Sequence, residues 1–240
     1  MSASNLTGER LLTNVASHAE ERLHFIEQLS RGRAPYKVVT LLSLEGRLDE
    51  EALERALSEL VVQHEVLRTG FTSVPAGLVR QVYAEVFAQL HRLDLRELQK
   101  TDGCSAVDRR LRALADEPFD LARPSLMRAV LAQVADSQWR LLIVCHHIIS
   151  DGRSQLVLVR ELAVRYVSLV QRGESVPLAS AGAVAIRQFA EGDREYADTM
   201  AGRAEARYWK ERLTGLSKEF PFPYDGDVQA KRNFRGETAF

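Results

Sequence analysis

The sequence predicts a mixed α/β fold for the region that ends near Arg172. Short apolar runs rich in β-branched residues have the composition of strands, and longer segments repeat apolar residues at helical spacing. Strands and helices that are mixed along a chain bury their apolar faces by packing in layers. We therefore expect a mixed sheet covered by helices.

Length and composition narrow the class of protein. The chain has 240 residues, 45% of them hydrophobic, which suits one large domain or two small ones with a packed core. The formal net charge is −1 and the basic residues are spread out, which argues against nucleic acid and anionic membranes. Two cysteines form no disulfide framework, and no apolar run has the length of a signal peptide or a membrane span. These features predict a cytoplasmic location.

The first half of the chain contains four predicted elements. A helix is expected over Ser17 to Leu29, followed by a buried strand over Lys37 to Leu44. Asp49 is a good N-cap for a second helix, which we expect to continue to about Arg68. The alternation of apolar and polar residues over Leu78 to Val86 is typical of a half-buried strand.

The second half begins with a predicted helix over Cys104 to Ala115. Leu126 to Val134 and Trp139 to His146 flank the polar stretch "ADSQ", which predicts a β-hairpin. Ser154 to Arg172 has the apolar stripe of a helix, and Gly173 is a natural stop.

The stretch "CHHIISDGRS", Cys145 to Ser154, contains the candidate functional residues. Two histidines at the end of an apolar strand fit a buried strand end, a metal site or an acid–base centre. Metal is disfavoured, because neighbouring strand residues face opposite ways and no second Cys/His cluster supplies further ligands. His147, at the strand end, could take a proton near neutral pH. Asp151 could orient it or pair with an arginine, and Gly152 permits an unusual backbone angle or the close approach of a substrate.

These residues resemble a known family. "HHIISDG" is similar to the HHxxxDG motif of the chloramphenicol acetyltransferase-like acyltransferases. Further stretches resemble, in order, the motifs of nonribosomal peptide synthetase condensation domains: "SHAEERLHFIEQL" from Ser17, "QHEVLRTGF" from Gln63, "EPFDLARPSLMRAVL" from Glu117, "YWKERLTGL" from Tyr208 and "FRGET" from Phe234. The chain departs from the family at four positions. Glu20 stands where Gln is usual and His24 where an aromatic residue is usual. Gln63 replaces the usual Arg, and Arg153 stands where Trp is common.

The resemblance implies a chloramphenicol acetyltransferase-like two-layer sandwich with a mixed β-sheet covered by helices. Condensation domains have two related lobes with a reaction tunnel between them, and the motifs of the second lobe do not occur here. Residues 1–175 are expected to form the N-terminal lobe. Residues 176–240, where Ala183 to Leu213 looks helical, would form a helical crossover and the start of the second lobe, whose remainder is absent.

The resemblance also implies a reaction and a set of site residues. Donor and acceptor carrier proteins would deliver thioesters on phosphopantetheine arms, so no bound cofactor and no metal is implied. His147 corresponds to the catalytic histidine, as base or as positioning group. Asp151 is the structural partner, expected in a salt bridge with Arg68.

Two further assignments concern the tunnel. Gly152 and Ser154 would line it. His146 is grouped with the tunnel residues, although its side chain is expected to face away, in a packing role with one hydrogen bond.

Two alternatives remain at this stage. A free-standing acyltransferase of the chloramphenicol acetyltransferase type would have subunits of about this size and would build its site between the subunits of a trimer. A lobe that carries His147 but catalyses nothing could still contact a carrier protein. The condensation-domain interpretation requires the second lobe as a partner and predicts that the isolated chain is inactive.

Overall fold

The candidate site lies at the end of a strand in the larger of the two sheets. The structure is a computed structural model that describes residues 10–30, 36–86, 88–174 and 186–216. This sheet has the order β2-β7-β6-β5. β7 (Gln138–His146) pairs antiparallel with β2 (Lys37–Glu45) and with β6 (Met127–Ala135), whereas β5 (Leu90–Asp94) runs parallel to β6. The predicted hairpin and the strand from Lys37 are confirmed, and β5 was not predicted.

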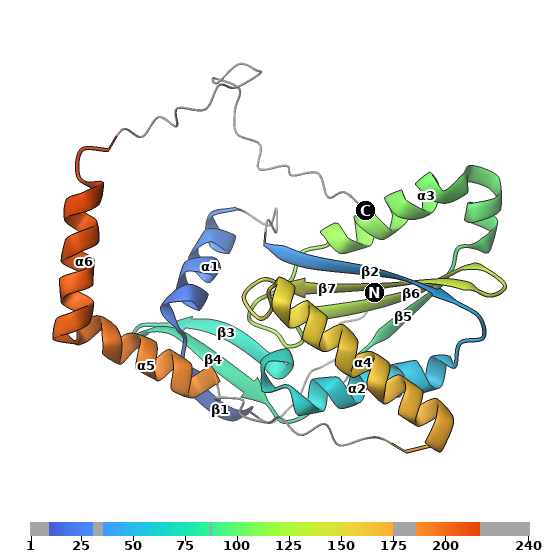
Figure 1. The fold of residues 1–240 in the computed structure, drawn as a ribbon, viewed down its shortest axis with the longest axis horizontal. Coiled ribbons are helices and arrows are strands. Elements are labelled where there is room, and N and C mark those ends of the chain that lie inside the picture. Colours follow the sequence, from blue (N-terminus) through green and yellow to red (C-terminus); the bar gives the residue numbers. More distant parts are fainter. Residues whose placement is uncertain (1–9, 31–35, 87, 175–185, 217–240) are drawn as a thin grey trace.

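Helices cover both faces of this mixed sheet (Figure 1). α2 (Glu50–Gln63) and α4 (Gly152–Arg172) pack on one face, where Ile143 points, and α3 (Arg96–Asp116) packs on the other, where Val144 points. Successive strand residues face opposite ways, so a strand covered on both sides must be apolar on both faces. The apolar run Leu141 to Cys145 of β7 has this composition. The expected mixed sheet covered by helices is confirmed.

Three helix boundaries can be compared with the start and stop signals in the sequence. Asp49 caps α2 by accepting a 2.9 Å hydrogen bond from the Ala52 N–H, as predicted. The helix stops at Gln63 rather than Arg68, because His64 is extended and Glu65–Arg68 form a separate 3₁₀ turn. At the end of α4, Gly173 adopts a left-handed φ of 71°, which confirms the predicted stop.

A smaller antiparallel sheet, β1-β4-β3, lies beside the first. β4 (Gly77–Tyr83) corresponds to the predicted alternating strand, whereas β1 (Arg10–Val15) and β3 (Thr69–Val74) were not predicted. α1 (His18–Leu29) follows β1 and begins with a capping box between Ser17 and Glu20.

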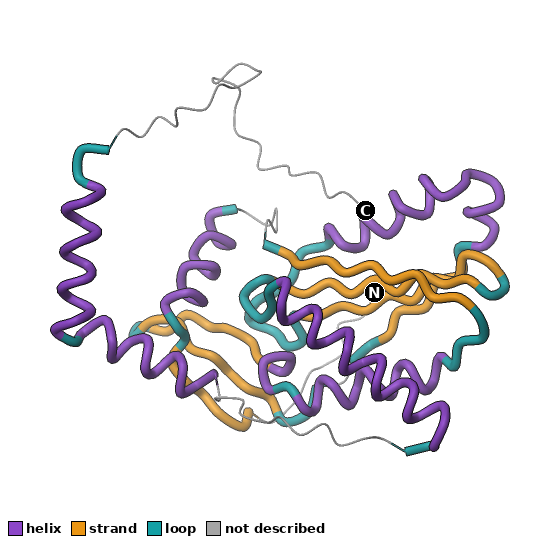
Figure 2. The backbone as a smooth tube through the Cα atoms, viewed as in Figure 1, coloured by secondary structure: helices purple, strands orange, loops and turns teal. Residues whose placement is uncertain are grey.

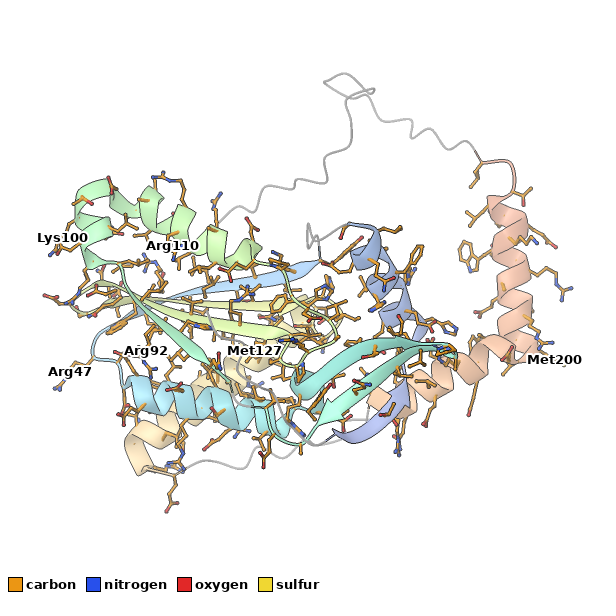
Figure 3. All side chains as sticks on the ribbon, turned by 180° about the vertical axis from the view of Figure 1, so that it is seen from behind. Arg47, Arg92, Lys100, Arg110, Met127 and Met200 are labelled. Atoms are coloured by element: carbon orange, nitrogen blue, oxygen red, sulfur yellow. The ribbon has the colours of Figure 1, made fainter. Side chains whose placement is uncertain are left out.

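Of the last two described helices, the first lies beside β1 and α1, and the second extends away from the sheets (Figure 2). The predicted helix is two helices, α5 (Ile186–Asp198) and α6 (Met200–Leu213), because Thr199 is extended and caps α6. Figure 3 shows Met200 at the opposite end of the molecule from Lys100. The start of the predicted helix at Ala183 and the "FRGET" stretch lie outside the described residues. Of the described helices, none is long and apolar enough to cross a membrane.

Candidate active site

The candidate site begins where β7 leaves the sheet. Cys145 and His146 are both fully buried, because the sheet is covered on both faces at this point. His147 is the first residue of the turn that follows, and it is exposed. The sequence therefore changes from buried strand to solvent between two adjacent histidines, so only the second presents its imidazole at the surface.

Backbone hydrogen bonds fix the turn that carries His147. The His147 N–H donates to the carbonyl of Tyr36, the residue before β2, at 2.8 Å, and the Ile149 N–H donates to the His146 carbonyl at 3.1 Å. The Ile148 N–H donates to His146 Nδ1 at 3.1 Å. Backbone donors are costly when left unpaired in a protein interior, so these bonds stabilise the turn in this conformation.

Asp151 caps α4 at the end of the same turn. Its Oδ1 accepts from the Ser154 N–H at 2.7 Å and from the Ser154 hydroxyl at 2.6 Å. These hydrogen bonds from Ser154 lower the pKa of Asp151 below its usual value. Asp151, Gly152 and Ser154 are all exposed beside His147. The structure thus brings four of the predicted site residues together at the N-terminus of α4.

The predicted salt bridge between Asp151 and Arg68 is wrong for this structure. Arg68 Nη1 donates to the Tyr83 carbonyl at 2.6 Å and its Nε donates to the Val61 carbonyl at 3.1 Å. The Asp151 carboxylate is engaged by Ser154 instead. Arg68 therefore joins the end of α2 to the end of β4 through backbone carbonyls, and each side chain has its own local partners.

Gly152 does not have an unusual backbone angle. It is the first residue of α4, and it is not among the described glycines with positive φ. A Cβ built on Gly152 would meet no atom within 4 Å, so the space beside it is open. The second expectation, close approach of a substrate, stays a prediction.

His146 lies beneath the turn. It is fully buried, which contradicts its grouping with the tunnel and agrees with its expected packing role with one hydrogen bond. Burial, together with the charge of His147, lowers the pKa of His146 to about 4. Its ring meets Phe119 edge-on, with centroids 6.3 Å apart. Glu27 Oε2 lies 3.4 Å from Nε2, and burial raises the pKa of Glu27.

A series of side-chain hydrogen bonds between β2, α4 and Ser150 also supports the turn. Thr40 Oγ1 donates to Gln155 Oε1 at 2.9 Å, and Gln155 Nε2 donates to Ser150 Oγ at 2.8 Å. Gln155 thus links β2 to the residue before Asp151 through α4. Burial raises the pKa of the neighbouring Cys145 to about 11, so its thiol stays protonated at neutral pH.

Three residues of this site were missed by sequence reasoning: Tyr36, Glu27 and Gln155. The Tyr36 ring lies 6.5 Å from the His147 ring in an edge arrangement, and its carbonyl holds the His147 backbone. Finding Tyr36 required the pairing of β2 with β7, in which Lys37 lies opposite His146. The hairpin alone could be predicted from the sequence, so this signal was lacking.

The site can exchange a proton or accept a hydrogen bond at one exposed imidazole, which stands on a hydrogen-bonded turn. Within the described residues, no group of three or more His, Cys, Asp or Glu side chains is arranged to hold a metal ion.

Comparison of the sequence with models of protein families shows the family of this chain. The family model described as "Condensation domain" matches residues 13–240. The chain belongs to the condensation domain family. Its curated relatives include a linear gramicidin synthase of Brevibacillus parabrevis, 34% identical over 92% of this chain and 4% of that protein. Bacitracin synthase 1 of Bacillus licheniformis is 30% identical over 93% of this chain and 4% of its own length.

Solved condensation domains share the fold of this one. The starter condensation domain of rhizomide synthetase RzmA superposes with a TM-score of 0.73 at 24% identity, covering 87% of this chain and 49% of that chain. The first condensation domain of the calcium-dependent antibiotic synthetase, in complex with substrate analogue 2a, gives a TM-score of 0.74 at 23% identity, with the same coverage. The present condensation-domain chain therefore spans about half of each solved domain and a small part of the synthetases. The chloramphenicol acetyltransferase-like α/β fold is confirmed.

Proposed function

We propose that this chain is the N-terminal lobe of a peptide-bond-forming condensation domain in a nonribosomal peptide synthetase. Residues 1–175 form the lobe, and residues 176–240 form the crossover and the start of a second lobe. The observation that carries the proposal is the exposed His147 on a fixed turn in a chain of this family. The protein works in the cytoplasm.

The substrates are two thioesters presented on the phosphopantetheine arms of a donor and an acceptor carrier protein. The acceptor amine attacks the donor carbonyl, a C–N bond forms, the C–S bond breaks, and the donor arm leaves as a thiol. A free α-amine has a pKa of about 8, so it is largely protonated at neutral pH and must lose a proton to react. His147 accepts a proton from the amine nitrogen or positions the amine, and the departing sulfur takes a proton back.

Positioning accounts for the need for a second lobe. Rate acceleration by proximity requires both substrates to be held near attack geometry. His147 lies on an open surface of the described lobe, which offers a wall on one side only. We therefore expect residues 1–240 alone to have no turnover and to gain it when a second lobe is supplied in cis or in trans.

The test is amide formation between two loaded carrier proteins, with the second lobe present. The expected result is turnover by the wild-type chain and its loss in His147→Ala. His91, an exposed histidine on β5, provides the matched control, and His91→Ala should keep full activity. Undiminished turnover in His147→Ala would overturn the catalytic assignment. Robust turnover by monomeric residues 1–240 would overturn the need for a second lobe.

A further inference from the structure

Two buried polar atoms face each other beneath His147. His146 Nε2 and Glu27 Oε2 are 3.4 Å apart, and their side chains are 0% and 10% exposed. Neither atom has a hydrogen-bond partner of standard geometry among the described residues. Buried donors and acceptors are costly when left unpaired, so each of these atoms is the natural partner of the other. A small rotation of the Glu27 carboxylate would complete the bond.

The other side of the ring fixes the position of its proton. His146 Nδ1 accepts a 3.1 Å hydrogen bond from the Ile148 N–H, so Nδ1 carries no proton. A neutral imidazole has one acceptor and one donor nitrogen, which places its proton on Nε2, facing Glu27. The lowered pKa of His146 agrees with a neutral ring at pH 7.

This ring holds the backbone on one side of His147. His146 Nδ1 accepts the hydrogen bond from the Ile148 N–H, and Ile148 is the residue directly after His147. The Tyr36 carbonyl accepts the N–H of His147 itself. The residue that presents the imidazole is thus fixed on both sides, once by a backbone carbonyl and once by the side chain of its neighbour.

We propose that Glu27 is a positioning residue. Its carboxylate holds the His146 imidazole as the Nε2–H tautomer, and His146 Nδ1 thereby fixes the Ile148 amide and the turn that presents His147. The Phe119 ring, edge-on to His146, restricts the same imidazole from another side. The catalytic consequence rests on the proposed function, whereas the tautomer and the fixed amide do not.

The experiment uses NMR on the ¹⁵N-labelled chain, with Glu27→Leu, Glu27→Gln and a matched control. Gln28→Leu is the control, because Gln28 is the exposed neighbour of Glu27 on α1. In the wild type, His146 should carry its proton on Nε2. In Glu27→Leu, the proton should shift toward Nδ1, and hydrogen exchange at the Ile148 amide should accelerate about tenfold or more, equivalent to about 1.4 kcal/mol. Glu27→Gln, whose amide oxygen still accepts from Nε2, should behave as the wild type, as should Gln28→Leu.

A second measurement separates positioning from simple structural support. In the carrier-protein assay with the second lobe present, Glu27→Leu should lower kcat about tenfold with little change in KM. Glu27→Gln should restore most of it. A wild-type His146 protonated on Nδ1, or an unchanged Ile148 exchange rate in Glu27→Leu, overturns the proposal. Because both NMR readouts need no turnover, a failure of the proposed catalytic function would leave them intact and would be recognised separately.

Discussion

Glu20 and Arg80 form an ion pair enclosed within the protein. Glu20 Oε1 lies 3.1 Å from Arg80 Nε, and the two side chains are 6% and 0% exposed. The other Glu20 oxygen accepts from the Ser17 N–H at 2.7 Å in the capping box of α1. A single carboxylate therefore starts α1 and attaches it to β4, and α1 is the helix that carries Glu27 to His146.

Removing one partner of this pair should be costly. Glu20→Leu leaves the Arg80 charge buried without a counter-ion, and we expect a loss of about 3–5 kcal/mol in the free energy of unfolding. Replacing both, as Glu20→Leu with Arg80→Met, should recover much of that loss, because no uncompensated charge remains. Urea unfolding of the two variants measures both effects.

The control for this pair is Glu97→Leu, which breaks the exposed Glu97–Lys100 pair on α3. Its urea midpoint should be nearly that of the wild type, because exposed pairs contribute little. A Glu20→Leu variant as stable as this control would contradict the prediction.

The sequence alone indicates one of the two residues of the Glu20–Arg80 pair. Glu20 could be recognised as a departure from the family, where Gln is usual, but its partner Arg80 reads as an ordinary polar residue of an alternating strand. Alternation assigns a residue to one face of a strand and does not say what covers that face. The burial of Arg80 depends on β1 and α1, and β1 was not predicted.

The restriction of sequence patterns to local information also explains which other features could and could not be predicted. The presence of helices in these segments, though not all of their ends, the hairpin and the position of His147 follow from local patterns of capping and periodicity, so they could be predicted. The second sheet, the parallel β5 and the partners of Arg68 depend on contacts between distant segments, which no local pattern contains. The capping role of Asp151 was available locally: a residue before a helical stripe, with Ser154 three positions later, fits an N-cap.

Asp151→Ala should destabilise the protein through loss of this cap. Ala cannot accept from the Ser154 N–H, and a lost N-cap typically costs about 1 kcal/mol. Asp151→Asn retains an acceptor oxygen and should therefore lose much less. Thermal or urea unfolding compares the two, and equal losses would show that the charge, rather than the cap, is what matters.

The contribution of the Asp151 charge should disappear in acid. Its pKa in the folded state is lowered from 3.8, so its stabilisation is fully present above 3.8 and is lost as the pH falls through the lower folded value. Asn does not titrate, so the stability of the wild type relative to Asp151→Asn should fall in that range. Urea midpoints of both proteins, measured from pH 6 down to about pH 2.5, provide the comparison. A stability difference that is constant with pH would contradict the assignment.

The two cysteines should differ sharply in reactivity. The thiolate is the reactive form, and burial both shields Cys145 and raises its pKa to about 11. Cys104 on α3 is exposed. A maleimide should modify Cys104 alone in the native chain and both residues in urea, as counted by mass spectrometry. Native Cys104→Ser should take up no label, and rapid labelling of its Cys145 would show that the end of β7 opens.

A double-mutant cycle tests whether Asp151 and Arg68 act independently. Arg68→Ala removes donors from the carbonyls of Val61 and Tyr83, which should cost about 1–3 kcal/mol. Asp151→Ala removes the cap of α4 instead. Because the two side chains have separate partners, the double variant should lose the sum of the two single losses, within about 0.5 kcal/mol.

A salt bridge would give a different result in the same cycle. If the carboxylate and the guanidinium attracted each other, each single variant would already remove the shared interaction, and the double variant would lose clearly less than the sum. Arg68→Lys provides a second arm, because Lys keeps the charge but cannot donate to two carbonyls from one planar group. Lys should therefore rescue an ion pair and fail to rescue the backbone contacts. Rescue by Lys together with a coupling above about 1 kcal/mol would restore the salt bridge as the element that fixes the His147 turn.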